Sequence, residues 1–363
     1  MKIILHLVED KKFLQASINK FSIDPSIRNI FISIGKLKYD KKGSTIIISL
    51  PTIVINKFIR FIHFFVRGVV IHGFGNSFFN VQFNKIHNKV KILGIFWGFD
   101  LYSINGSKED FLMPETIKMN RGSHNFSKKF GEKKFIEFIN QRIDFVSTIV
   151  PSENKILNSH FPKANFKFTW FSYFDLENDV LNGIQNKKLV FSGQNILYGN
   201  NSSLWNNHID GIEEIKSFKF NFDKIICPLS YSGSVEYRQK VIEVFSNEFK
   251  NKFRPLTSFL KYSDYLQLLL SCPYVFFNSK RQIGLGNLLF SIYLGSVVIL
   301  NSNNPLFHFF LSNGIKVFSI EEAQSSESFE LDISKNRENL GLLFNEEALK
   351  ERSLQVIQNL IEE

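Results

Sequence analysis

Residues 280–287 combine two basic side chains, two glycines and a predicted helix start. They follow an apolar run at 274–277, so the order is strand, Gly-rich turn and helix. Gly284 and Gly286 let a ligand approach the main chain closely, and the first N–H groups of a helix attract anions. Arg281 adds a planar fork suited to two phosphate oxygens. The stretch predicts a phosphate site, although a tight turn with a surface arginine explains it equally well.

Polar residues also end two predicted strands in the first half of the chain. His72 follows the strand at 68–72 and precedes a glycine, where it either acts as a base toward a sugar hydroxyl or caps a turn. Trp97 ends the strand at 91–97, and Asp100 and Tyr102 follow it. Two flat rings and a carboxylate suit carbohydrate, whereas the simpler alternative is a capping aspartate with both rings in the core. Loops at strand ends favour the functional interpretation.

The polar stretch 199–208 opens another predicted helix. Asn200, Asn206 and His208 lie in it, and its serines and asparagines are typical helix caps. Capping explains much of the stretch. The same helix start would serve a diphosphate if it faces a ligand.

These candidate residues need a scaffold of strands and helices to bring them together. Short apolar runs alternate with helical patterns in the first half, with strands expected at 2–7, 29–34, 44–49, 68–72, 91–97, 145–150 and 166–173. The pattern restarts with strands at 188–192, 223–228, 274–278 and 296–300. Near-continuous apolar strands between helices predict parallel sheets covered on both faces. We therefore predict an α/β protein with two doubly wound domains, whose ligand lies between them at the strand ends.

The domain boundaries follow from composition. We predict an N-terminal domain over 1–175, a polar linker at 174–187, a C-terminal domain over 188–325 and a terminal helix over 338–363 that packs back on the N-terminal domain.

The expected helix at 51–66 carries a basic stripe made by Lys57, Arg60, His63 and Arg67, and its remaining surface is Ile, Val and Phe, including Phe61 and Phe64. Such a helix either lies in a membrane interface or is buried with a thin solvated edge. On the sequence alone the buried alternative is slightly favoured.

Composition narrows the partners and the chemistry. The formal charge is +10 over 363 residues, which suits a phosphate-rich partner: nucleic acid, an anionic membrane or a diphosphate substrate. We expect no leader peptide and no membrane span, and a reducing compartment for the two cysteines. No Walker sequence, serine elbow, zinc spacing or Asp-x-Asp pair occurs. We therefore expect no cofactor and a phosphate site that works without metal.

Together these stretches resemble the TDP-N-acetylfucosamine:lipid II N-acetylfucosaminyltransferases, the 4-acetamido-4,6-dideoxygalactose transferases of enterobacterial common antigen synthesis (glycosyltransferase family 56). The resemblance covers about residues 72–305 and rests on an ordered set: His72-Gly73, Trp97-Gly98-x-Asp100-Leu101-Tyr102, Gly199-Asn200 with Asn206 and His208, Pro228-Leu229-Ser230-Tyr231, Pro255-Leu256-Thr257, Tyr265-Leu266, Ser271-Cys272, Arg281-Gln282-x-Gly284-x-Gly286-Asn287 and Asn304-Pro305. Two departures are the extended segment 194–198 and Ile283 in place of the usual second Gln.

The resemblance implies a GT-B glycosyltransferase with two Rossmann-like domains, the acceptor on the N-terminal half and a dTDP-sugar on the C-terminal half. It also implies an undecaprenyl-diphosphate-linked saccharide as acceptor and peripheral attachment to the cytoplasmic face of the inner membrane. This raises the membrane interpretation of 51–66 above the buried one, and it makes nucleic acid an unexpected partner.

Our hypothesis is therefore transfer of a 4-acetamido-4,6-dideoxyhexose in surface polysaccharide synthesis. The donor diphosphate is assigned to Arg281, Gln282, Gly284, Gly286, Asn287, Asn200, Asn206, His208 and Tyr231. Asp100, with His72 second, is the expected base, and Trp97 and Tyr102 are the expected sugar platform. The rivals are a GT-B transferase that uses a UDP- or GDP-sugar and a non-catalytic, membrane-docked scaffold of polysaccharide assembly.

Overall fold

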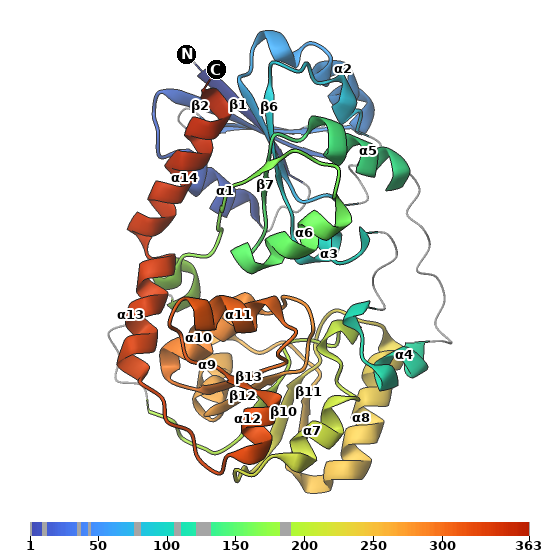
Figure 1. Ribbon diagram of the computed structural model, residues 1–363, viewed down its shortest axis with the longest axis vertical. Helices are drawn as coiled ribbons and strands as arrows, with labels where there is room; N and C mark the ends of the chain where they lie inside the picture. The colour runs from blue at the N-terminus through green and yellow to red at the C-terminus, as the bar shows by residue number, and fades with distance from the viewer. Residues whose placement is uncertain are drawn as a thin grey trace. The chain divides into compact units, whose positions relative to one another are not determined.

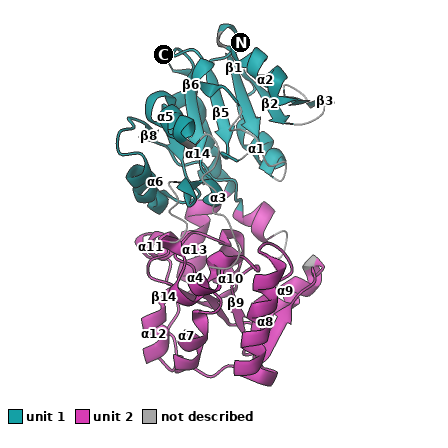
Figure 2. Cartoon of the chain, turned by 90° about the vertical axis from the view of Figure 1, so that its right-hand side faces the viewer, with its two compact units in different colours: residues 1–106, 127–175, 346–363 teal, residues 107–126, 176–345 magenta. Residues whose placement is uncertain are grey.

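The computed structural model describes residues 2–8, 13–34, 38–42, 45–75, 81–104, 110–120, 132–181 and 190–362. The chain forms two compact units (Figure 1; Figure 2). Unit 1 consists of residues 1–106, 127–175 and 346–363, and unit 2 of residues 107–126 and 176–345. Each unit is built on its own sheet, and the chain passes between the units more than once.

Unit 1 holds a sheet in the strand order β3-β4-β2-β1-β5-β6-β7-β8. All neighbouring strands pair in parallel except β3, which is antiparallel to β4. The central strands are buried almost throughout because their runs are nearly all apolar, as expected for a parallel sheet covered on both faces. The strands are β1 Lys2–Val8, β2 Ile27–Ile34, β3 Lys38–Lys42, β4 Thr45–Leu50, β5 Gly68–His72, β6 Lys91–Ile95, β7 Phe145–Ser147 and β8 Lys167–Phe168.

Helices cover this sheet: α1 Leu14–Phe21, α2 Thr52–Ile59, α3 Gly98–Leu101, α5 Glu132–Arg142, α6 Asn154–His160 and α14 Glu346–Ile361, with short 3₁₀ turns η2 Ile62–Phe64, η4 Phe83–Lys85 and η6 Pro151–Glu153. The helix expected at 51–66 is shorter than predicted, because α2 ends at Ile59 and the chain continues into η2. Helix α14 contacts α1, β5 and β6, so the end of the chain packs on unit 1 (Figure 2).

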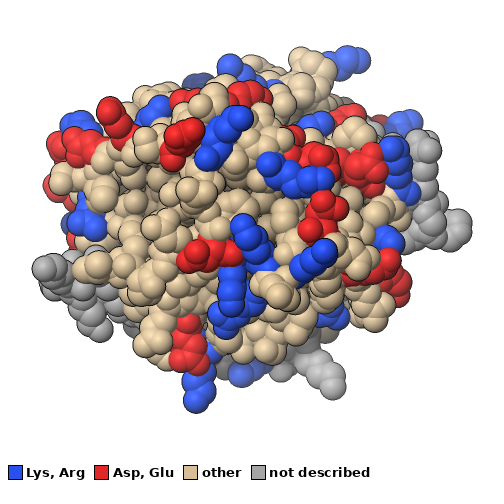
Figure 3. Space-filling model, turned by 90° about the horizontal axis from the view of Figure 1, so that it is seen from below, with Lys and Arg blue, Asp and Glu red and all other residues tan. Residues whose placement is uncertain are grey.

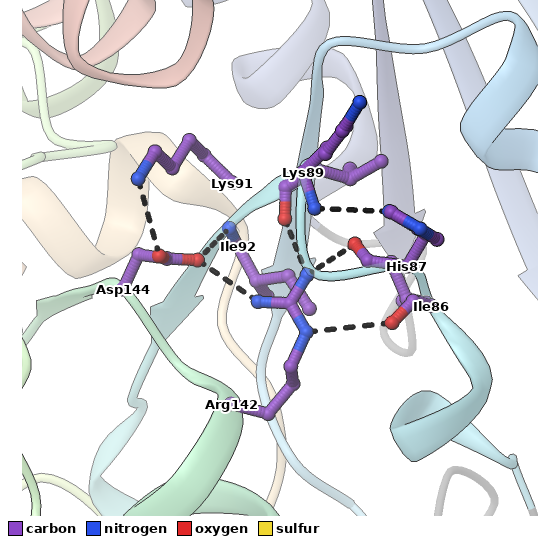
Figure 4. Close-up of polar contacts among 8 residues, drawn as sticks. Ile86, His87, Lys89, Lys91, Ile92, Arg142 and Asp144 are labelled. Atoms are coloured by element: carbon purple, nitrogen blue, oxygen red, sulfur yellow. Dashed lines mark hydrogen bonds and ion pairs between the residues drawn. The ribbon is translucent and has the colours of Figure 1, made fainter. Parts of the chain in front are cut away.

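One arginine secures the chain where it enters β6 (Figure 4). The Arg142 guanidinium donates to three backbone carbonyl oxygens in the preceding segment, those of Ile86, His87 and Val90. It also donates to Asp144 over 3.1 Å, and Asp144 accepts the Ile92 N–H over 2.8 Å. The planar guanidinium thus provides hydrogen bonds to carbonyl groups that lie outside the strands. Through Asp144 it also links the start of β6 to the start of β7.

Unit 2 holds a parallel sheet in the order β11-β10-β9-β12-β13-β14. The strands are β9 Ile196–Tyr198, β10 Ile225–Pro228, β11 Phe253–Leu256, β12 Tyr274–Phe277, β13 Val297–Leu300 and β14 Phe318–Ser319. The chain runs from β9 outward to β11 and then returns to β12 on the other side of β9. Strands β9 and β12 therefore flank the point where strand order reverses, which is where open α/β sheets bind ligands.

The central strand of unit 2 differs from the prediction. We expected it at 188–192, but residues 190–192 are not strand and residues 188 and 189 lie outside the described residues. The strand is instead β9, inside the segment 194–198 that we treated as an extension. Only three apolar residues form it, and all three are buried because they lie between β10 and β12.

The helices of unit 2 include one element from far upstream. They are α4 Pro114–Asn120, α7 Gly211–Ser217, α8 Val235–Phe249, α9 Tyr262–Leu270, α10 Leu285–Leu294, α11 Pro305–Ser312, α12 Ile320–Ser325 and α13 Ile333–Phe344, with a π-helical turn η7 Leu176–Leu181 and 3₁₀ turns η8 Leu204–Asn206 and η9 Lys250–Lys252. Asp210 binds the start of α4, because its carboxylate accepts the N–H groups of Glu115 and Thr116 and the Thr116 hydroxyl. This contact joins α4 to unit 2.

Positive and negative side chains are mixed on one face of the molecule. On the face in Figure 3, Lys and Arg side chains are intermixed with Asp and Glu. Some charges of unit 2 pair at close range, for example Lys216 with Glu213 and Glu248. Among the described residues, no helix has both the length and the apolar character that a bilayer crossing requires.

Candidate active site

Buried polar atoms without a hydrogen-bond partner gather at the carboxyl end of β9. Within the described residues, Asn200 Oδ1, Asn206 Oδ1 and His208 Nε2 are buried and make no hydrogen bond. Two of them point at Gly199: a Cβ built there would lie 3.0 Å from Asn206 Oδ1 and 3.2 Å from His208 Nε2. Because an unmade buried hydrogen bond is costly, such a group is expected to serve a ligand.

His208 is a neutral side chain in this pocket. Burial lowers its pKa from 6.5 to about 3. The Tyr237 oxygen accepts the His208 backbone N–H over 3.2 Å and lies 3.3 Å from Nδ1. In the tautomer in which Tyr237 donates its proton to Nδ1, the imidazole proton lies on Nε2, and His208 then offers a donor toward Gly199. The neighbouring Oδ1 of Asn206 is an acceptor, because its Nδ2 already donates to Asn201.

Arg281 lies in the turn after β12, on the other side of the strand-order reversal. It is buried, and its guanidinium lies 4.8 Å from the centre of the Trp205 ring, which fixes the plane of the fork. Asn304 stabilises the turn, because its side-chain Nδ2 donates to the carbonyl oxygens of Ser279 and Arg281 over 2.8 and 2.9 Å. The turn is therefore held rigidly from two sides.

Helix α10 begins directly after this turn, against the β9 loop. Gly284 is its N-cap with φ +69°, and a Cβ there would lie 3.2 Å from Asn200 Cγ. The first turn of α10 contains Gly286 and Asn287, whose N–H groups have no partner inside the helix. Gln282 is buried beside Arg281 and accepts from Arg281 Nε over 3.3 Å. The predicted donor residues thus converge on one edge, except Tyr231, which lies exposed one loop away.

Sequence reasoning missed several members of this neighbourhood. Asn278 follows β12 and has a buried Nδ2 without a partner among the described residues, while its Oδ1 accepts from Asn301 over 3.0 Å. Trp205 lies in the predicted stretch 199–208 without a role of its own, and Asn304 was expected only as part of the Asn304-Pro305 pair. The common feature that could have found Asn278 and Asn301 is an asparagine directly after an apolar strand.

Asp100 of unit 1 is a buried carboxylate with a raised pKa. Its Oδ2 accepts the Phe74 N–H and its Oδ1 the Leu101 N–H, each over 2.8 Å. Burial raises its pKa from 3.8 to about 7, and the backbone N–H groups oppose that shift in part. A carboxylate near this pKa can accept a proton at neutral pH, so the assignment of Asp100 as base stays a prediction with a physical rationale.

His72 belongs to an internal network, which revises its place as the second candidate base. Its Nε2 lies 3.0 Å from His6 Nδ1, and its Nδ1 lies 2.6 Å from the Tyr173 hydroxyl. His6 in turn lies 3.0 Å from Asn29 Oδ1. Burial lowers the pKa of both histidines. Both ring nitrogens of His72 are engaged and its side chain has no exposed surface, whereas Asp100 is 3% exposed, so Asp100 remains the first candidate base and His72 becomes a less favoured one.

The predicted sugar platform also needs correction. Tyr102 is fully buried and donates its hydroxyl to Glu153 over 2.7 Å, while the Trp97 ring is 4 % exposed. Neither side chain offers an open face, because both pack into the core. The exposed ring of this turn is Phe99, which lies 5.9 Å from the Trp97 ring. Phe99 is therefore the aromatic side chain that a sugar could contact here.

Gly73 lets the chain pass under Trp97, and this gives a stability prediction. Its φ is +81°, and a Cβ there would lie 2.8 Å from the Trp97 ring. Gly73→Ala should lower the free energy of unfolding by about 1–3 kcal/mol, from backbone strain and the displaced ring. Denaturant unfolding would measure this. Gly341→Ala is the matched control: no atom lies within 4 Å and the site is helical, so about 0.5–1 kcal/mol should be gained. An unchanged Gly73→Ala midpoint would contradict the packing described.

Comparison with known proteins agrees with this arrangement. Residues 173–348 match the family model described as 4-alpha-L-fucosyltransferase glycosyl transferase group 56. The match covers 176 of the 363 residues, so the C-terminal half of the chain is similar to glycosyltransferase group 56. The match contains every element of the β9 and β12 edge, so the buried polar residues described above lie in the part of the chain that the family model matches.

Solved structures show the fold of this glycosyltransferase. It resembles a glycosyltransferase from Rickettsia africae ESF-5 at TM-score 0.61 and 14% identity, with 99% of each chain covered. It also resembles Anabaena Alr3699/HepE in complex with UDP and glucose at TM-score 0.57 and 11% identity, covering 99% of this chain and 100% of that one. A sucrose-phosphate synthase from Thermosynechococcus elongatus matches at TM-score 0.59 and 11% identity, with 99% of each chain covered. The fold is GT-B, as the sequence predicted.

The family match gives the reaction class. The protein is a glycosyltransferase, which uses a nucleotide-sugar donor and an acceptor. Among the described residues no cluster of three or more His, Cys, Asp or Glu side chains is arranged to hold a metal ion.

Proposed function

We propose that this glycosyltransferase transfers a 4-acetamido-4,6-dideoxyhexose from a dTDP-sugar to an undecaprenyl-diphosphate-linked saccharide. The observation that carries the proposal is the set of unpartnered buried atoms of Asn200, Asn206 and His208, which lies at the strand-order reversal within the family-matched residues. A donor at His208 suits a diphosphate oxygen, and the asparagine acceptors suit sugar hydroxyl or amide groups.

The chemistry assigned to the side chains is a single displacement. The acceptor oxygen forms a bond to the anomeric carbon as the bond from that carbon to the diphosphate breaks, and the electron pair leaves with the diphosphate. Asp100 takes the proton from the acceptor hydroxyl. Arg281 and the first N–H groups of α10 face the charge that develops on the departing diphosphate, where preorganised donors contribute most.

Titration of dTDP, UDP and GDP into the purified protein tests the donor class. We expect dTDP to bind tightest and to lose affinity in Arg281→Ala. Preference for UDP or GDP would keep the transferase and discard the dideoxyamino-sugar donor. Binding of none of the three by the folded protein would favour the non-catalytic scaffold instead.

The lipid-linked acceptor is supported by an exposed surface of unit 1, which we name the α2 surface. It consists of exposed apolar side chains interleaved with exposed cations: Ile53, Val54, Phe58, Phe61, Phe64, Phe65, Lys57, Arg60 and Arg67. Phe61, Phe64 and Phe65 are each more than 60% exposed, and residues 51–67 contain no Asp or Glu. We propose that this surface lies on an anionic bilayer, with the rings among the acyl chains and the cations at the headgroups, which would hold the enzyme peripherally at the cytoplasmic face of the inner membrane.

Vesicle sedimentation tests this attachment. The triple variant Phe61→Ser, Phe64→Ser, Phe65→Ser should lose at least tenfold in its partition onto vesicles containing anionic lipid, because the buried ring area is removed. Leu342→Ser is the control, since that side chain is 66% exposed but belongs to unit 2. Equal partition of the two variants would discard the α2 surface as the membrane contact.

A further inference from the structure

A pair of exposed aromatic rings lies beside the donor pocket and has no role in the contacts described so far. Tyr231 follows β10 and Phe259 follows β11, and they are 41% and 75% exposed. Their ring centroids are 5.6 Å apart with an interplanar angle of 17°, so the two rings stack in parallel. Stacked aromatic rings that remain exposed to solvent are unusual unless they bind a partner.

The position of the pair along the sheet fits one part of a nucleotide-sugar. The strand order β11-β10-β9-β12 places the loops at the carboxyl edge in a row: Phe259, then Tyr231, then Asn200 and His208, then Arg281. Neighbouring strands lie about 4.8 Å apart, so β11 lies roughly 10 Å from β9. A nucleotide whose diphosphate contacts the β9 and β12 loops can reach the loops of β10 and β11 with its base, and that side of the row carries the two exposed stacked rings.

The loop that carries Tyr231 is locked to the diphosphate pocket. Ser202, next to Asn200 and Asn201 and fully buried, donates its N–H and its hydroxyl to the Tyr231 carbonyl over 3.0 and 2.9 Å. At the other end of the loop, Ser234 caps α8 by accepting the Tyr237 N–H over 3.1 Å, and Tyr237 contacts His208. Tyr231 is thus held in fixed register with Asn200 and His208.

The second loop is attached to the first in the same way. The Leu229 N–H donates to the Leu256 carbonyl over 2.8 Å, which continues the pairing of β10 and β11 beyond the strand ends. Phe259 follows three residues later and rests on Tyr231. The stacking on Tyr231 orders the Phe259 ring before a ligand binds, and such preorganisation lowers the entropy cost when a planar ligand stacks on it.

We propose that Tyr231 and Phe259 form a stacking platform for the base of the nucleotide-sugar donor, with Tyr231 backing Phe259 and the base on the open face of Phe259. The platform rests on the proposed donor site. Because every base has a π-face, the platform supplies affinity and not base identity, so it strengthens dTDP and UDP alike.

Calorimetric titration with dTDP, UDP and inorganic pyrophosphate separates the base from the phosphates. Phe259→Ala should weaken dTDP and UDP about 5- to 150-fold each, the range for loss of one stacked base, and leave pyrophosphate unchanged. Phe259→Tyr should retain the affinity, since it keeps the ring. Tyr231→Ala should weaken the nucleotides as well, by removing the support of Phe259. Leu342→Ala, an exposed apolar side chain elsewhere in unit 2, should change nothing.

A spectroscopic readout guards against misfolded variants. Tryptophan emission of Phe259→Trp, after subtraction of the parent protein, should be quenched by dTDP and not by pyrophosphate. Unchanged dTDP affinity in Phe259→Ala, with binding still lost in Arg281→Ala, would overturn the platform and leave the donor site standing. Equal weakening of dTDP and pyrophosphate would also overturn it. Absence of nucleotide binding in the unaltered protein would overturn the donor site and the platform together.

Discussion

Arg281→Ala should lower kcat/KM for sugar transfer by about 10²- to 10³-fold, the usual loss when one preorganised donor to a developing oxyanion is removed. The expectation rests on the setting of the side chain. Arg281 is 7% exposed, its plane is fixed over Trp205, and its turn is pinned by Asn304. A charge that is already desolvated and oriented costs little reorganisation when the diphosphate departs.

Arg281→Lys should recover only part of this loss, because an ammonium group keeps the charge but lacks the planar fork. Arg337→Ala is a matched control: its guanidinium also lies over an aromatic ring, 4.9 Å from the centre of Tyr293, but on α13 and away from the strand ends. It should retain full turnover. If Arg281→Ala transferred sugar at the rate of Arg337→Ala, the departing diphosphate would have to lie elsewhere.

The turn after β12 and the loop that begins at Gly199 could be predicted from the sequence because their signals are local. Gly284 and Gly286 follow an apolar run by a few residues, and the strand-turn-helix order places them at a sheet edge without further information. Gly199 and Asn200 were found in the same way. The strand that carries them was misplaced, since β9 has only three residues and gains its burial from β10 and β12, which are distant in the chain.

The sequence did not predict which side chains are exposed or which segments distant in the chain contact each other. Trp97 and Tyr102 have the composition of a carbohydrate platform, yet Tyr102 is turned inward by Glu153, which lies 51 residues away. Likewise α4 belongs to unit 2 because Asp210 binds Thr116, a contact across 94 residues. The platform of Tyr231 and Phe259 depends on strand order, which brings the loops after β10 and β11 side by side. The local sequence pattern predicts none of these three contacts.

The second large effect is expected at Asp100. Asp100→Asn should lower kcat by about 10²- to 10⁴-fold, the usual contribution of a general base. In the parent enzyme kcat/KM should fall about tenfold per pH unit below a pKa of about 7, because only the ionised carboxylate accepts the proton. The residual activity of Asp100→Asn should lack this acid limb. A pH profile of both proteins measures the two effects together.

The stability of the Asp100→Asn variant distinguishes loss of the base from damage to the fold. Burial raises the pKa of Asp100 from 3.8 to about 7, so the folded state binds this proton more tightly than the unfolded state, and stability from this group is lost as pH rises across that window. An Asn at position 100 is neutral and avoids the cost of burying an ionised carboxylate, but it keeps only one of the two acceptor oxygens. These effects oppose each other, so the unfolding midpoint at pH 8 should change little. Glu153→Gln neutralises another buried carboxylate of unit 1 and should keep the acid limb. An acid limb that survives in Asp100→Asn would assign the base to another group, because no protonation of residue 100 could then produce it.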